Sequence, residues 1–167
     1  QMPNATEYLP DRSISSHYLS SKNTVGMKCS ICPFIFRRYQ NVARNIRCGL
    51  IQSSCDWSPV EFDITEIKRL MIAKHVDLVE QAARDAVKIL CLQEIFYGPY
   101  FCCEEDARWK VIAEPIPGPT TAIFQEIAQK YEMVMVLPIY ETPAPGEFYN
   151  TASVIDADGS LLGIYRK

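Results

Sequence analysis

The chain has 167 residues, of which 48% are hydrophobic and 22% charged, the composition of an ordinary globular domain. A formal net charge of −3, with no long run of lysine or arginine, argues against a nucleic-acid partner. The longest apolar stretches, such as Val134 to Tyr140, are far too short to cross a bilayer, so we expect no membrane partner.

Seven cysteines raise the alternatives of a disulfide framework or a metal site. Cys48 and Cys91 lie in apolar, strand-like runs, where a free cysteine behaves as a small hydrophobic residue, so we expect a reducing, cytoplasmic location. Cys29 and Cys32 have the spacing of a zinc knuckle, but no second cysteine or histidine pair lies at a suitable distance. We therefore predict no metal and no cofactor.

The first 43 residues show no sustained periodicity and predict an irregular extension, whereas residues 44–167 read as one domain. The domain begins with a strand over Ile46–Gln52. A helix is then expected to start with Ser58 as N-cap and Pro59 in its first turn. Apolar residues three or four apart predict its buried stripe: Val60, Ile64, Ile67, Met71, His75, Leu78, Ala82 and Ala86. His75 is interpreted as a core histidine, the catalytic alternative having no reactive neighbour in sequence.

The next run, Val87–Gln93, predicts a strand that is covered on both faces and parallel to the first. A second helix over Pro119–Tyr131 leads to a strand over Met133–Tyr140. Two more strands, joined by a tight turn at Asp158 and Gly159, complete a meander. These last strands span Phe148–Asp156 and Leu161–Arg166.

Glu94 follows a predicted strand, at the edge of the sheet where α/β proteins bind ligands. An apolar setting there would raise the pKa of this carboxyl and suit a general base, although a turn cap or a surface ion pair is an equal alternative. The aromatic loop after Glu94 includes Tyr97 and Phe101, which we predict to bind substrate. The alternative for that loop is a hydrophobic plug or a subunit contact.

Lys167 ends the last predicted strand, where it is either a solvated terminus or a fixed charge that stabilises an oxyanion. Cys102 and Cys103 lie in the loop after Glu94, but a loop lacks the preorganisation that activates a nucleophilic thiol. Strand alternation directs Cys91 away from Glu94.

Several segments, in this order, resemble landmarks of the nitrilase or carbon–nitrogen hydrolase superfamily. They are Val87 to Phe101, Glu114 to Thr120, Pro138 to Glu141, Tyr149 to Ala152 and Tyr165 to Lys167. The resemblance implies an α/β fold, the αββα sandwich of that family, truncated here to roughly its first half. It also implies a Glu–Lys–Cys triad in which Glu94 is the general base, Lys167 stabilises the oxyanion, and the nucleophilic Cys is absent from this chain.

Within that superfamily the aromatic loop and the stretch Pro138 to Glu141 are most similar to N-carbamoyl amidohydrolases of the β-ureidopropionase or N-carbamoylputrescine type. The implied reaction converts a small N-carbamoyl amino acid or amine into an amine, carbon dioxide and ammonia, in an enzyme that forms homo-oligomers. Because the chain starts at Gln1 and stops at Lys167, a second hypothesis is an inactive fragment that acts at most as an interaction or dimerisation module. A third is another amidase or nitrilase branch.

Overall fold

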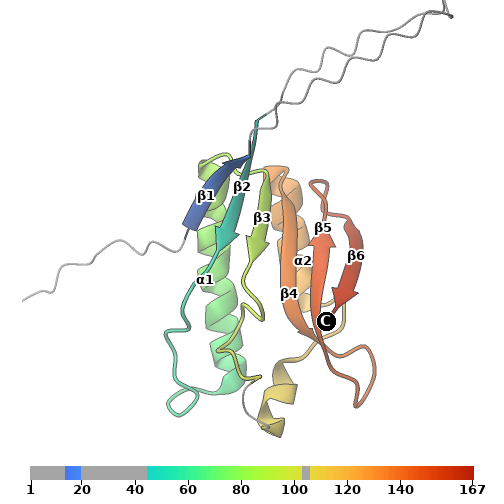
Figure 1. Ribbon diagram of the computed structural model, residues 1–167. Coiled ribbons are helices and arrows are strands. Elements are labelled where there is room, and N and C mark those ends of the chain that lie inside the picture. Colours follow the sequence, from blue (N-terminus) through green and yellow to red (C-terminus); the bar gives the residue numbers. More distant parts are fainter. Residues whose placement is uncertain (1–13, 20–44, 103–105) are drawn as a thin grey trace, which may run out of the picture.

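A computed structural model describes residues 14–19, 45–102 and 106–167. These residues form a mixed sheet whose strands lie side by side in chain order, with the α-helices packed against it (Figure 1). The strands are β1 (Ile14–Leu19), β2 (Ile46–Ile51), β3 (Ile89–Leu92), β4 (Val134–Glu141), β5 (Tyr149–Ile155) and β6 (Leu161–Arg166). The helices are α1 (Ile64–Arg84), the 3₁₀ helix η1 (Ala107–Ile112) and α2 (Pro119–Tyr131).

The predicted βαβ unit and meander are both confirmed. β2, β3 and β4 are parallel neighbours, while β5 and β6 return antiparallel to the strand before them. The turn between β5 and β6 closes with Gly159 at a φ of 86°, a conformation that glycine adopts without strain. Because two reversals separate β6 from β4, β3 and β6 run in the same direction and end at the same edge of the sheet.

The predicted start of the first helix is wrong by about one and a half turns. α1 begins at Ile64, and its N-cap is Asp63, whose carboxylate accepts hydrogen bonds from the backbone N–H groups of Thr65 and Glu66. Ser58 instead closes an isolated turn, because its carbonyl accepts from Phe62 at 3.0 Å. A carboxylate at a helix N-terminus also interacts favourably with the helix dipole, which a serine cannot do.

The rest of the predicted stripe lies in the core, but its two ends do not. Val60, ahead of the helix, is 90% exposed. Ala86, beyond the helix, is exposed and has a φ of 57°. The buried residues of α1 are Ile64, Ile67, Met71, His75, Leu78, Val79 and Ala82.

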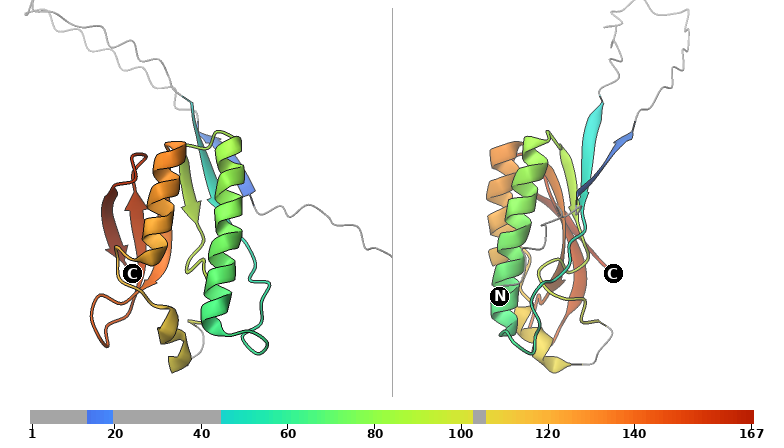
Figure 2. Two further views of the ribbon diagram at one scale, coloured as in Figure 1. Left: turned by 180° about the vertical axis from the view of Figure 1, so that it is seen from behind. Right: turned by 90° about the vertical axis from the view of Figure 1, so that its left-hand side faces the viewer.

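Both α-helices lie on one face of the sheet, as the two views in Figure 2 show. The prediction that β3 is covered on both faces is wrong for the described residues, because burial along it alternates. Leu90 and Leu92 are buried, whereas Ile89 is 38% exposed. Leu50 on β2 and Tyr165 on β6 are also exposed. One helix layer on one sheet is half of the expected αββα sandwich.

The region expected to be an irregular extension contains one regular element. Ile14–Leu19 forms β1, which pairs antiparallel with β2. Its sequence shows no clean apolar alternation, so the strand is specified by pairing with β2 rather than by a local pattern. Cys29 and Cys32 lie outside the described residues. Neither α-helix of the described residues has the combined length and apolar character that crossing a membrane requires.

Candidate active site

Glu94 and Lys167 meet at the edge of the sheet where β3 and β6 end. Lys167 Nζ lies 2.8 Å from Glu94 Oε1, and the Asn150 side-chain amide donates to the same oxygen. The backbone N–H of Lys167 donates to the Asn150 carbonyl at 2.9 Å, which continues the β5–β6 ladder by one residue. The structure therefore brings the two predicted polar residues together, although 73 positions separate them in the chain.

The electrostatics of Glu94 differ from the sequence-based expectation. Its side chain is 38% exposed rather than enclosed by apolar groups. The hydrogen bond from Lys167 holds the pKa of this carboxyl below its usual value, with Asn150 adding to the effect and desolvation opposing it. The same contact raises the pKa of the Lys167 ammonium. The expected rise in the pKa of Glu94 is therefore wrong, and the pair is ionised at neutral pH.

An ion pair between the exposed Arg166 and the buried Glu141 anchors the strand that carries Lys167. The Arg166 guanidinium donates to both carboxylate oxygens of Glu141, at 2.8 and 2.6 Å, and Glu141 is 1% exposed. Thr151 also donates to Glu141, at 2.6 Å. Because side chains alternate along a strand, fixing Arg166 on the helix side directs Lys167 to the opposite side. Sequence reasoning missed this support, since Glu141 and Arg166 are recognisable as partners only once β4, β5 and β6 are paired.

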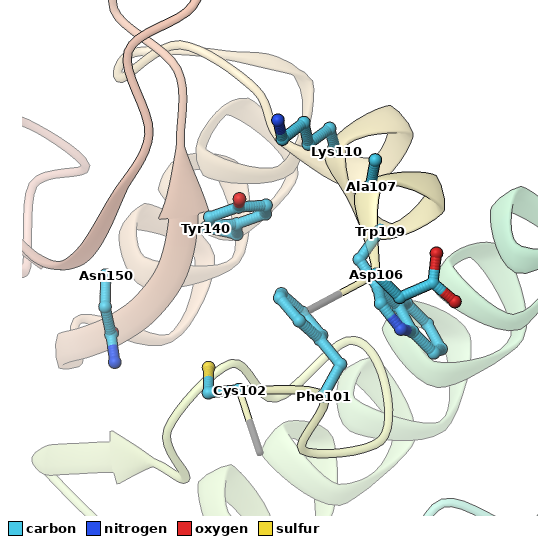
Figure 3. A pocket seen from close by; sticks show the side chains of 8 residues that line it. All are labelled: Phe101, Cys102, Asp106, Ala107, Trp109, Lys110, Tyr140 and Asn150. Carbon is cyan, nitrogen blue, oxygen red and sulfur yellow. The ribbon is translucent and has the colours of Figure 1, made fainter. Parts of the chain in front are cut away.

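A cavity of about 500 Å³ lies next to the ion pair (Figure 3). Its aromatic wall consists of Phe101, stacked on Trp109 at a centroid distance of 5.1 Å, and Tyr140, which meets Phe101 edge-on. The described residues that line it are Phe101, Cys102, Asp106, Ala107, Trp109, Lys110, Tyr140 and Asn150. Because Asn150 both lines the cavity and contacts Glu94, the cavity opens toward the ion pair. Its size and lining are those of a small-molecule site.

The two aromatic residues predicted to bind substrate have different positions. Phe101 lines the cavity. Tyr97 is 0% exposed, so it offers no surface to a ligand. Its hydroxyl accepts from the Tyr140 N–H at 2.7 Å and donates to the Tyr140 carbonyl at 3.1 Å, and burial raises the pKa of this phenol. Tyr97 therefore holds Tyr140 in the cavity wall rather than contacting substrate.

His75 is confirmed as a core residue. It is 0% exposed, its Nδ1 lies 2.8 Å from the Met71 carbonyl, and its ring meets Phe96 edge-on. Burial lowers the pKa of the imidazole, which favours the neutral form. These contacts account for the residue without a catalytic role.

The described cysteines considered as nucleophiles differ in their exposure to solvent. Cys102 is exposed and lines the cavity, whereas Cys103 lies outside the described residues. Cys91 is partly buried within β3, and burial raises the pKa of its thiol, which disfavours the thiolate. A raised pKa argues against Cys91 as a nucleophile.

Comparison with known proteins matches this chain to one family. The carbon–nitrogen hydrolase profile matches residues 63–167. Among curated proteins, a β-ureidopropionase of Arabidopsis thaliana is 35% identical over 155 residues, which is 92% of this chain and 38% of that protein. An N-carbamoylputrescine amidase of Oryza sativa subsp. japonica is 34% identical over 109 residues, 65% of this chain and 36% of that protein. The chain thus spans less than two fifths of the length of these relatives.

A solved structure shows the same arrangement of elements. The carbon–nitrogen hydrolase from Helicobacter pylori G27 superposes with a TM-score of 0.63 at 28% sequence identity. The match covers 73% of this chain and 39% of that one.

Proposed function

Because the chain belongs to the carbon–nitrogen hydrolase family, we propose that the whole protein hydrolyses a small N-carbamoyl compound. The observation that carries the proposal is the ion pair between Glu94 and Lys167, 2.8 Å apart, beside an aromatic cavity at the carboxyl edge of the sheet. The relatives named for N-carbamoyl substrates support the choice of substrate class.

Glu94 is proposed as the general base. Both of its hydrogen bonds from described residues use Oε1, so Oε2 is available to accept a proton. A carboxylate that is already ionised at neutral pH requires no prior deprotonation before it acts. The proton comes from the thiol of a cysteine that the family resemblance implies downstream of Lys167, and the resulting thiolate attacks the carbonyl carbon.

Lys167 is proposed to stabilise the tetrahedral oxyanion that this attack creates. Its ammonium is held at one position by Glu94 and by the backbone pairing of its own N–H, so little reorganisation is needed as charge develops. The carbonyl re-forms as the first nitrogen departs with a proton, and water then hydrolyses the carbamoyl-enzyme to a carbamic acid, which breaks down to carbon dioxide and the second nitrogen product. The balanced reaction consumes one N-carbamoyl compound and one water, and yields an amine, carbon dioxide and ammonia.

The decisive experiment measures ammonia release by the whole purified protein. Wild type is expected to hydrolyse an N-carbamoyl compound faster than a simple aliphatic amide or nitrile of similar length. Glu94→Gln preserves size but removes the base, and should lower kcat/KM by about a hundredfold to ten-thousandfold. An unchanged melting temperature in that variant would exclude misfolding as the cause. Preferential hydrolysis of the nitrile, or a Glu94→Gln variant with nearly normal turnover, would contradict the proposal.

A further inference from the structure

The charged residues around the cavity differ in whether they form an ion pair. Asp106 lines it, but its carboxylate is paired with the Arg108 guanidinium and accepts the Arg108 backbone N–H at 2.9 Å. Glu94, at the mouth, is paired with Lys167. Among the described residues, both acidic groups therefore already have an adjacent cation as partner.

Lys110 is the exception among the charged residues of this wall. It makes no ion pair within the part of the chain that the structure describes. Its Nζ lies 5.3 Å from the centre of the Phe148 ring, a cation–π contact that leaves the ammonium free to donate hydrogen bonds. In Figure 3 Lys110 and Asn150 come from different parts of the cavity wall. Lys110 thus offers a cation on a part of the cavity wall different from that of Asn150, which contacts Glu94.

The position of Lys110 is set by buried neighbours. It lies in η1 directly after Trp109, which is 4% exposed and stacked on Phe101. The Lys110 carbonyl accepts from Ala113 N–H at 3.2 Å at the end of η1. A backbone held in this way restricts where the ammonium can reach, which is a requirement for selecting among ligands of similar size.

We propose that Lys110 determines specificity by binding the carboxylate of the substrate, so that the substrate is an N-carbamoyl acid rather than an N-carbamoyl amine. The inference rests on the hydrolase activity proposed above and narrows its substrate class. A carboxylate on Lys110 pairs with its ammonium, whereas an ammonium group there meets like charge.

The test compares three probes of similar length in the whole protein: 3-ureidopropionate, which is anionic, N-butylurea, which is neutral, and N-carbamoylputrescine, which is cationic. Lys110→Gln should lower kcat/KM for 3-ureidopropionate by about tenfold to a hundredfold, mainly through KM, since a hydrogen bond to a charged group is lost. Turnover of N-butylurea should change by less than about threefold, because no charge is bound there. Lys110→Arg should restore most of the loss, and Lys110→Glu should favour N-carbamoylputrescine.

Lys130→Gln is the matched control. Lys130 is also exposed and lies 4.7 Å from the centre of an aromatic ring, that of Tyr131, but it does not line the cavity. An equal loss for all three probes in Lys110→Gln, or no loss at all, would overturn the inference while leaving the hydrolase activity standing.

Calorimetry on the Glu94→Gln protein separates binding from turnover. 3-Ureidopropionate should bind more tightly than N-butylurea, and Lys110→Gln in that background should remove the difference. One outcome is that wild type hydrolyses none of the probes while 3-ureidopropionate still binds more tightly than N-butylurea. In that case the proposed activity fails and the anion site stands. Equal affinities for the two probes would overturn the anion site.

Discussion

Two Glu–Lys ion pairs in this molecule have nearly the same N–O distance but differ in solvent exposure. Glu94 and Lys167 are 2.8 Å apart, with side chains 38% and 68% exposed. Glu114 and Lys68 are 3.0 Å apart, with side chains 7% and 16% exposed. The first pair lies at the carboxyl edge of the sheet, and the second joins α1 to the segment that enters α2. Their difference in exposure separates the pair proposed to react from the pair that holds elements together.

The buried pair, Glu114 and Lys68, makes further contacts with the backbone and with an aromatic ring. Lys68 also donates to the Ile112 carbonyl at 2.8 Å, and its Nζ lies 4.5 Å from the centre of the Tyr97 ring. Glu114 also accepts from the Thr120 N–H at 3.2 Å, in the first turn of α2. Glu94, in contrast, keeps one oxygen free of hydrogen bonds from the described residues. A Glu–Lys pair therefore acts as a brace where both side chains are buried and make further hydrogen bonds, and as a candidate site where one carboxylate oxygen is left available.

The largest effect is expected when the buried pair is broken. Lys68→Met keeps the length of the side chain but leaves the Glu114 carboxylate buried without its partner. The free energy of unfolding of the whole protein should fall by about 3–5 kcal/mol. Urea unfolding at neutral pH measures this change. Lys130→Met, which breaks the exposed pair with Glu80, should cost less than about 1 kcal/mol. Similar losses in the two variants would mean that burial does not distinguish these pairs.

Breaking the exposed pair should affect turnover rather than stability. Lys167→Met removes the charge aimed at the oxyanion and should lower kcat by about a hundredfold to a thousandfold, equivalent to roughly 2.7–4 kcal/mol. The melting temperature should stay near that of wild type, because exposed ion pairs contribute little to folding. Steady-state kinetics and thermal unfolding on the same sample measure both. A melting temperature that falls in proportion to activity would assign Lys167 a structural role.

The smallest effect concerns the pH dependence of the base. Lys167 chiefly, and Asn150 in addition, hold the pKa of Glu94 below its usual value by bonding to the charged form. Asn150→Ala removes one of these bonds, so the pKa of Glu94 should rise and the carboxylate should become protonated at a higher pH. The acid limb of the kcat/KM profile should therefore move to higher pH, with little change at neutral pH because the carboxyl stays ionised there.

Gln125→Ala provides the control for the pH experiment. Gln125 also donates a side-chain amide hydrogen bond, to the Gly159 carbonyl at 2.8 Å, but it lies on α2 away from the cavity lining. The acid limb of the kcat/KM profile of Gln125→Ala should match that of wild type. An acid limb that moves to lower pH in Asn150→Ala would contradict the assignment of Glu94 as the base.

Local patterns were sufficient to predict the order of α-helices and strands from β2 onward, but not β1 or η1, and the two polar residues at the strand ends. Apolar spacing along α1 and the Asp158–Gly159 turn predicted the βαβ unit and the meander, because helix and strand periodicities are properties of short segments. Glu94 and Lys167 were recognisable because each directly follows a predicted strand, and the resemblance to known hydrolases supplied their roles.

Tertiary structure alone decided the surroundings of those residues. The pKa of Glu94 falls because Lys167 reaches it across 73 positions of sequence, and no local pattern reports that distance. Tyr97 is fully enclosed whereas Phe101 lines the cavity, although both belong to one aromatic loop. Lys110 differs from the other charged residues near the cavity because they form ion pairs, whereas Lys110 forms none within the described residues. Charge, burial and partnership depend on which segments meet in space, so they appear only when the sheet is assembled.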